Sequence, residues 1–166
     1  MVHLNLTNNS NNQNKNQSLY YQFIDDMPSY GAQKITKKPL PDKSLKQPYK
    51  ILLVEDDPVS QKAQKILLEI QGYQVDAVFT GEEALTIFSK GYDIIILDIG
   101  LPGISGIDTA KAIRQLKNGT EIPIIGLTAH GVKIVEECIN AGFNEVAHKP
   151  IMDYISLNKI IMKYLS

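Results

Sequence analysis

From Lys50 onward, short apolar runs alternate with stretches that carry apolar residues at helical spacing, and this alternation constrains the fold more than any other feature. A short run that is apolar throughout is typical of a strand buried on both faces of a parallel sheet. The most hydrophobic run is therefore expected at the sheet centre, and it is Ile94–Leu97. The predicted strands are Ile51–Val54, Val75–Phe79, Ile94–Leu97, Pro123–Leu127 and Glu145–Ala147.

The stretches between these runs are predicted to be helices. Pro58 suits the first turn of a helix, Gly72 suits a helix end, and Thr80 suits an N-cap. The expected helices run from Pro58 to Gly72 (apolar positions Ala63, Ile66, Leu67 and Ile70), after Thr80 (Ala84, Leu85 and Phe88), and over Ser105–Leu116, Val132–Asn140 and Asp153–Leu165. Right-handed crossovers place such helices on both faces of a sheet. The predicted fold class is α/β, a doubly wound five-stranded parallel sheet with the flavodoxin-like strand order 2-1-3-4-5.

The first 49 residues differ in composition from the rest of the chain. An Asn-rich run from Asn8 to Gln17 lacks the apolar surface that folding requires, so we expect disorder there. Leu19–Ile24 is a short aromatic and apolar island, which is either a docking segment or a sticky spot in a flexible tail. Lys34–Pro48 is rich in Lys and Pro and is expected to be an extended linker. The predicted organisation is a tail and linker over residues 1–49 and one globular domain over residues 50–166.

Charge and cysteine content exclude several classes of function. From Lys50 onward, ten lysines and one arginine stand against fifteen acidic residues, which argues against direct binding of nucleic acid. The single cysteine, Cys138, excludes an intramolecular disulfide and fits a reducing compartment. No apolar run approaches the roughly 20 residues of a membrane span, and the N-terminus lacks the apolar segment of a secretory signal. A cytoplasmic protein without a membrane contact is therefore predicted.

Polar residues follow four of the predicted strands. Glu55–Asp57 follow the first strand, Asp98 the third, Thr128 the fourth and Lys149 the fifth. In an open parallel sheet, ligands bind outside the carboxyl ends of the strands, near the point where the strand order reverses. We therefore expect these side chains to share one pocket.

This combination of side chains indicates a specific chemistry. Crowded carboxylates disfavour one another's charged form, and a divalent cation relieves that conflict. A pocket with oxygen ligands alone favours Mg²⁺, which recruits phosphate oxygens. Asp98, at the end of the central strand, is the expected nucleophile, because aspartate carboxylates form acyl phosphates. Lys149 would add positive charge for the phosphoryl group, and Thr128 a hydrogen bond.

Each residue also has an ordinary structural explanation when it is considered alone. Asp57, before Pro58, could simply cap a helix, and Thr128 could do the same. A Lys149–Pro150 pair near a C-terminus is common. The joint pattern is what indicates a phosphoryl-accepting site.

Four segments together resemble the receiver domains of two-component response regulators. They are Ile51–Asp57, Asp98–Gly106, Thr128–His130 and Lys149–Ile151, and the similarity spans Lys50–Ser166. The last two segments are most similar to receivers attached to hybrid sensor kinases.

The resemblance implies roles for six residues. Asp98 would be the phosphoacceptor, Asp56 a direct metal ligand, Glu55 a ligand through water, and Gly100 a ligand through its carbonyl. Thr128 and Lys149 would contact the phosphoryl group. The donor would be the phosphohistidine of a histidine kinase or a histidine phosphotransfer protein. Such a domain catalyses its own phosphorylation but is not a conventional turnover enzyme.

Two features depart from the family pattern, and both lie on the usual output face. Val146 stands where an aromatic residue is usual, three positions before Lys149. The interval from Thr128 to Lys149 is also one residue shorter than the common spacing. The route by which the signal leaves the domain is therefore an open question, whereas the residues of the phosphorylation chemistry are all present.

Competing functions are less well supported. A flavodoxin needs a Ser, Thr and Gly loop where this chain has Glu55–Pro58, and a haloacid-dehalogenase-type phosphatase needs a second Asp where this chain has Gly100. A degenerate receiver would have lost acids that are present here. Three forms of output stay open: a stand-alone relay protein with no attached output domain, an excised C-terminal receiver of a hybrid sensor histidine kinase, and a phosphorylation-dependent interaction module.

Overall fold

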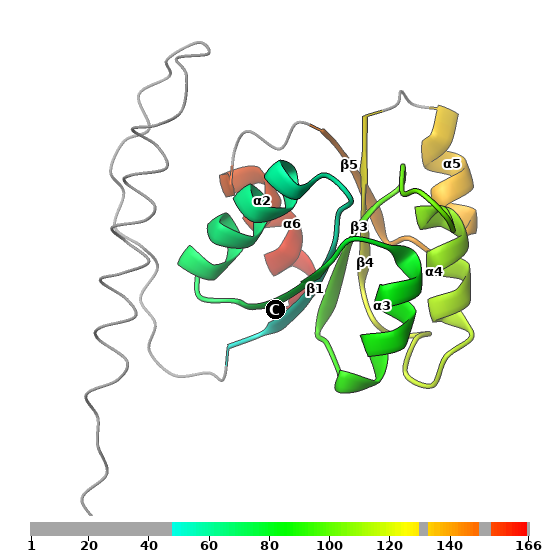
Figure 1. Ribbon diagram of the computed structural model, residues 1–166, viewed down its shortest axis with the longest axis horizontal. Coiled ribbons are helices and arrows are strands. Elements are labelled where there is room, and N and C mark those ends of the chain that lie inside the picture. Colours follow the sequence, from blue (N-terminus) through cyan, green and yellow to red (C-terminus); the bar gives the residue numbers. More distant parts are fainter. Residues whose placement is uncertain (1–47, 130–132, 150–153, 166) are drawn as a thin grey trace, which may run out of the picture.

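A computed structural model describes residues 48–129, 133–149 and 154–165. Its centre is a five-stranded parallel sheet with the strand order β2-β1-β3-β4-β5 (Figure 1). The predicted fold class and strand order are confirmed, and each predicted strand is present within one residue at either end. The strands are β1 (Lys50–Val54), β2 (Gln74–Val78), β3 (Ile94–Asp98), β4 (Ile124–Thr128) and β5 (Glu145–His148).

Helices cover both faces of the sheet. On one face lie α2 (Pro58–Ile70) and α6 (Tyr154–Leu165), and on the other lie α3 (Gly81–Ile87), α4 (Gly106–Arg114) and α5 (Lys133–Asn140) (Figure 1). A short 3₁₀ turn, η1 (Phe88–Lys90), extends α3. Because all five strands are parallel, their carboxyl ends lie at the same edge of the sheet.

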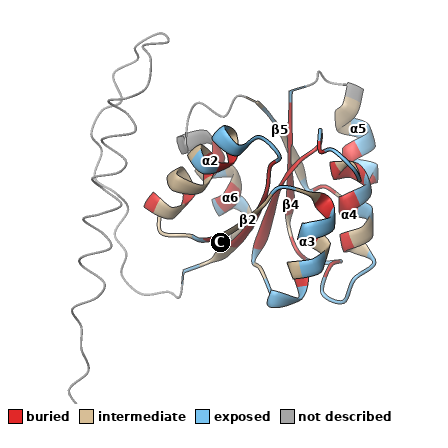
Figure 2. Ribbon diagram, in the orientation of Figure 1, coloured by how far each residue is buried: buried red, intermediate tan, exposed pale blue. Residues whose placement is uncertain are grey.

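Two apolar clusters fill the spaces between the sheet and its helices. Alternate residues of a strand point to opposite faces, so Leu52 of β1 packs towards α3, α4 and α5, whereas Leu53 packs towards α2 and α6. All five residues of β3 are buried, as the prediction of a central strand requires (Figure 2). The central position of β3 brings its last residue, Asp98, to the middle of the sheet edge.

Side chains at the helix starts hold the connections that follow the strands. The carboxylate of Asp57 accepts a hydrogen bond from Ser60 N at 2.7 Å, and Thr80 forms a reciprocal capping box with Glu83. The backbone hydrogen bond from Ser60 is also the main reason why the pKa of Asp57 is lowered. Ser105, predicted as the first helical residue, is the N-cap of α4. The helix-capping alternative for Asp57 is thus confirmed.

The predicted apolar face of α2 was partly wrong. The residues that α2 buries are Gln61, Gln64, Leu68 and Ile70, whereas Ile66 and Leu67 are only half-buried. The inward face carries two amides because its first turns pack beside the end of β1, where polar groups require partners.

Several predictions concern residues outside the described ranges. They include the Asn-rich run, the island Leu19–Ile24, the linker up to residue 47, and His130, Pro150 and Ile151. The division into residues 1–49 and 50–166 therefore stays a prediction. No helix among the described residues combines the length and apolar character that a bilayer crossing requires.

Candidate functional site

The polar residues predicted to share a pocket lie at one edge of the sheet. Glu55 directly follows β1, Asp98 is the last residue of β3, Thr128 is the last residue of β4, and Lys149 directly follows β5. Parallel pairing of β1, β3, β4 and β5 brings these four strand ends side by side. The topology therefore places the residues together even though up to 94 positions separate them in the chain.

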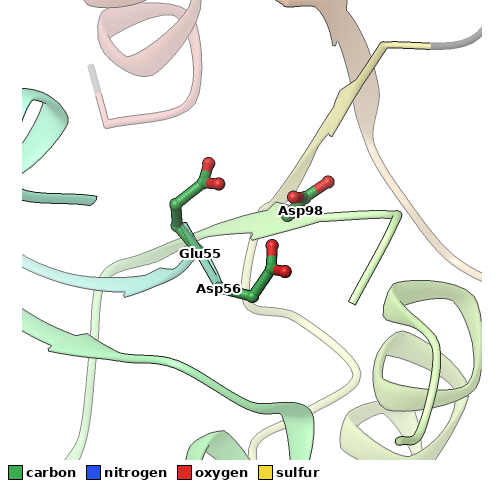
Figure 3. Close-up of side chains that lie close together, drawn as sticks. All are labelled: Glu55, Asp56 and Asp98. Carbon is green, nitrogen blue, oxygen red and sulfur yellow. The ribbon is translucent and has the colours of Figure 1, made fainter. Parts of the chain in front are cut away.

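Three carboxylates form the centre of this site. Oxygen atoms of Glu55, Asp56 and Asp98 lie within 4.8 Å of one another, and the side chains extend into a common space (Figure 3). Glu55 and Asp98 are 1% and 6% exposed, whereas Asp56 is open to solvent. Two buried acids and one exposed acid thus face each other, and such an arrangement requires positive charge nearby.

Lys149 supplies that charge. Its Nζ lies 2.6 Å from Asp98 Oδ2, and 2.9 and 2.7 Å from Glu55 Oε1 and Oε2. Burial acts to lower the pKa of Lys149, but hydrogen bonds to Asp98 and Glu55 outweigh burial, so the pKa is raised above its ordinary value. The ammonium group is therefore charged at neutral pH and neutralises both buried carboxylates.

The backbone after β3 holds the other oxygen of Asp98. Gly100 N donates a hydrogen bond to Asp98 Oδ1 at 2.9 Å. The start of α4 then returns so closely that a Cβ atom on Gly106 would lie 2.1 Å from the Asp98 carbonyl oxygen. Only glycine permits this approach without displacing the strand end. The loop thus aims Asp98 towards the other two carboxylates.

Two glutamines of α2 hold Glu55, and sequence reasoning did not find them. Gln61 Nε2 donates to the Glu55 carbonyl at 3.1 Å and to the Val78 carbonyl at 2.8 Å. Gln64 Nε2 donates to Glu55 Oε2 at 2.8 Å. The available signal was spacing, because Gln61, Gln64 and Leu68 fall on one stripe of a helix.

Thr128 is the last residue of β4 and is 1% exposed. It lies beside the chain that leaves β5 and carries Lys149. Its carbonyl accepts a hydrogen bond from Lys149 N at 2.7 Å. This backbone bond fixes where β5 ends, and thereby fixes the start of the Lys149 side chain beside Asp98 and Glu55.

The donor set of the site fits a hard divalent cation. Its candidate ligands are carboxylate and carbonyl oxygens, and the cluster Glu55, Asp56 and Asp98 contains neither cysteine nor histidine. The exposed position of Asp56 leaves that side of the cluster open to water and to an incoming ligand. Asp57, the third acid after β1, is committed to capping α2 instead.

Comparison with known proteins identifies the family. Residues 51–161 match the model of the response regulator receiver domain. The chain belongs to this family. This receiver domain carries its acidic cluster at the carboxyl ends of a parallel five-stranded sheet.

Curated relatives include much longer proteins. The chain is 34% identical over 130 residues to hybrid signal transduction histidine kinase I of Dictyostelium discoideum. The aligned region covers 71% of this chain and 8% of the kinase. It is 36% identical over 103 residues to the aerobic respiration control sensor protein ArcB of Escherichia coli, and the aligned region covers 61% of this chain and 13% of ArcB. The transcriptional regulatory protein CpxR of E. coli is 37% identical over 105 residues, which are 63% of this chain and 44% of CpxR. This receiver domain therefore spans less than half of each relative, and only about a tenth of the two sensor proteins.

Solved structures of similar size match the whole globular part. The receiver domain of sensor histidine kinase PA1611 from Pseudomonas aeruginosa is 35% identical, with a TM-score of 0.67 over 72% of this chain and 98% of that one. That structure holds a magnesium ion coordinated in its active-site cleft. A response regulator from Chloroflexus aurantiacus is 30% identical, with a TM-score of 0.68 over 72% of this chain and 98% of that one.

Proposed function

We propose that this receiver domain accepts a phosphoryl group on Asp98, with Mg²⁺ as the required cation. The observation that supports the proposal most is the position of Asp98. It is the only one of the three clustered carboxylates that lies at the end of the central strand, is buried, and is both ion-paired to Lys149 and oriented by Gly100.

The reaction forms one bond and breaks another. A carboxylate oxygen of Asp98 attacks phosphorus, the bond between phosphorus and the donor's imidazole nitrogen breaks, and the imidazole leaves with the bonding electron pair. Asp56, Asp98 and the Gly100 carbonyl would hold the cation directly, and Glu55 through water. The cation supplies charge stabilisation for the phosphoryl oxygens. Lys149 Nζ and the Thr128 hydroxyl bind the same oxygens.

The proposed partner is a histidine kinase or a histidine phosphotransfer protein. Two of the similar proteins are hybrid sensors in which a receiver belongs to a longer kinase, which supports this choice. The proposed unit of function is the domain over residues 50–166. Because it takes one phosphoryl group per molecule, it promotes its own modification and passes the group on, without the turnover of a conventional enzyme. A second candidate, the receiver segment of a hybrid kinase, fits the small share of each relative that the chain covers.

Intact-mass measurement tests the proposal. The protein is incubated with phosphoramidate and Mg²⁺, and one added phosphoryl group is expected. Asp98→Asn is expected to give none, whereas the matched variant Asp93→Asn, before β3, keeps full labelling. Undiminished labelling of Asp98→Asn would show that another residue is the acceptor.

A further inference from the structure

One buried side chain near the site has no place in the proposed reaction. Gln64, on the inward face of α2, is 9% exposed, and its Nε2 donates to Glu55 Oε2 at 2.8 Å. Its Oε1 is buried and has no hydrogen-bond partner within the described part of the chain. A buried amide with half of its hydrogen-bonding capacity unused costs free energy that an apolar side chain would not. The contact with Glu55 offsets that cost, which suggests a role for Gln64 in the site.

Glu55 is itself placed to hold Lys149. Both carboxylate oxygens face Lys149 Nζ, at 2.7 and 2.9 Å, while a single oxygen of Asp98 faces it at 2.6 Å. When Asp98 becomes an acyl phosphate, the negative charge moves from its carboxylate to the phosphoryl oxygens. Lys149 must then follow that charge, and its contact with Glu55 is the one that stays.

Glu and Lys side chains have several rotatable bonds, so an ion pair between them needs an anchor to stay in one geometry. Two side-chain amides of helix α2 are that anchor. Gln61 fixes the Glu55 carbonyl and Gln64 fixes its carboxylate, both from the same helix. The contacts form a chain from Gln64 through Glu55 and Lys149 to Asp98.

We propose that Gln64 is a positioning residue of the phosphoacceptor site. Its amide fixes the carboxylate of Glu55. Glu55 in turn keeps Lys149 in place while Asp98 reacts. This inference rests on the proposed function. It assigns Glu55 a task besides any contact with the cation, and it makes a residue outside the acidic cluster part of the reaction.

The test compares Gln64→Met with Gln71→Met in the full chain. Methionine matches glutamine in length and removes the amide. Gln71 is a matched control because its Nε2 donates to the Leu67 carbonyl at 3.1 Å, its Oε1 is also buried and unpartnered, and it does not touch the site. Gln64→Leu, which also removes the donor and adds no charge beside Glu55, is a second variant if Gln64→Met does not fold. Initial phosphorylation rates with phosphoramidate are measured against Mg²⁺ concentration, and circular dichroism checks folding.

We expect Gln64→Met to lower the rate at saturating Mg²⁺ roughly three- to tenfold, less than the full strength of a hydrogen bond to a charged group, because Gln64 acts on the reaction only through Glu55 and Lys149. The Mg²⁺ concentration for half-maximal rate should change less than twofold, since Asp56 and Asp98, the proposed direct ligands of the cation, are unchanged. Gln64 instead acts on Lys149 through Glu55. Gln71→Met should keep the parent rate. In a Glu55→Ala background, Gln64→Met should have no further effect, because the residue through which it acts is absent.

Equal losses in Gln64→Met and Gln71→Met, or an undiminished effect of Gln64→Met in the Glu55→Ala background, would overturn the inference. So would parent rates in both Gln64 variants. These outcomes differ from failure of the proposed function, in which the parent protein itself takes no phosphoryl group on Asp98.

Discussion

At the scale of single residues, Lys149 is the group on which the resting site depends. It is the cation that pairs with both Glu55 and Asp98, which are almost completely buried. Removing one partner of a buried ion pair leaves uncompensated charge, which costs more than the pair itself contributes. The site is therefore stable without a bound cation only while Lys149 is present.

Lys149→Ala should thus destabilise the cation-free protein by about 2–4 kcal/mol, towards the lower part of the range for buried pairs because the cluster opens to solvent at Asp56. Urea unfolding measures this free energy. Mg²⁺ should restore part of it, because a divalent cation can neutralise the same carboxylates. Lys163→Ala is the control, since Lys163 pairs with Glu145 at the surface and its loss should matter little. Equal stability losses in the two variants would contradict this account.

Asp56, unlike Lys149, adds to the repulsion between like charges in the site. It is exposed and makes no ion pair within the described part of the chain, and it faces two other carboxylates. Asp56→Ala should therefore leave the cation-free melting temperature unchanged or raise it by a few degrees, as relief of like-charge repulsion predicts.

The same variant should lose the rise in melting temperature that Mg²⁺ produces in the parent protein, and it should not be phosphorylated. Thermal unfolding with and without Mg²⁺ measures both effects of the cation. Asp57→Ala is the matched control. It loses the cap of α2 and should melt lower, yet keep its response to Mg²⁺. A full Mg²⁺ response in Asp56→Ala would exclude Asp56 as a ligand.

At the scale of secondary-structure elements, the sequence predicted most of what depends on local rules. Strands followed from apolar runs, and the caps at Asp57 and Thr80 followed from residue type and position. Contacts between distant elements were not predictable. Arg114 donates to the carbonyls of Gly119, Ile122 and Gly142 and to Asn144 Oδ1, and so ties the end of α4 to the connection before β5. Helical periodicity places Arg114 at a helix end but does not identify carbonyls 28 positions away.

The candidate site shows the same division. The four strand ends that meet could be predicted because parallel topology determines where they go. The glutamines of α2 could not, because their partner Glu55 becomes a neighbour only when α2 packs on the sheet. Glu55 was expected to act on a cation through water, and its contacts with Lys149 and Gln64 were not foreseen.

A second polar cluster joins β1, β2 and the turn before β3, away from the site. Tyr92 Oη donates to Asp76 Oδ2 at 2.8 Å, and Lys50 Nζ lies 3.4 Å from the same oxygen and 4.7 Å from the Tyr92 ring centre. Burial, and then the bond to Asp76, raise the pKa of Tyr92. The folded protein thus keeps this proton at a pH at which the unfolded chain has released it.

The sign of the pH effect follows from that difference. The contribution of Tyr92 to stability is complete below its unfolded pKa of about 10 and is lost as pH rises above it. Tyr92→Phe should therefore reduce the loss of stability between about pH 10 and 11 by at most about 1.4 kcal/mol per pH unit, and by less where solvent screens the cluster. Urea unfolding across this range measures the slope. Identical slopes in the parent and the variant would contradict the prediction.

At the scale of the whole molecule, the site adjoins the face formed by α5, β5 and α6, because Lys149 directly follows β5 and pairs with Asp98. Val146 lies on β5, is half-buried and packs against the apolar cluster beneath α3, α4 and α5. The neighbouring aromatic residue is Phe143, which is 3% exposed, and a Cβ on Gly126 would lie 2.9 Å from its ring. The interior beside β4 and β5 is therefore already filled by a buried ring.

This packing bears on how phosphorylation spreads through the domain. A large ring at position 146 would have two resting places, one inside and one outside, and could act as a two-state reporter. Valine is small and stiff about its first side-chain torsion, so it has no comparable second position. We therefore predict that phosphorylation changes the face formed by α5, β5 and α6 less than is usual in the family. Partner choice would then depend on the phosphoryl group and the loops around Asp98, as suits a domain that passes phosphate to a histidine.

Amide-resolved NMR of the Mg²⁺-bound domain, before and after phosphorylation, measures this spread. The largest shifts are expected around Asp56, Asp98 and Thr128, with small shifts across Val135–Ala141 and 153–165. Val146→Tyr is the matched variant, because a ring restored at this position should enlarge the shifts on α5 and α6. If the parent protein shows larger shifts on α5 and α6 than around the site, the prediction of a small change on this face is wrong. Another side chain then acts as the reporter, and Val146 only fills space in the core.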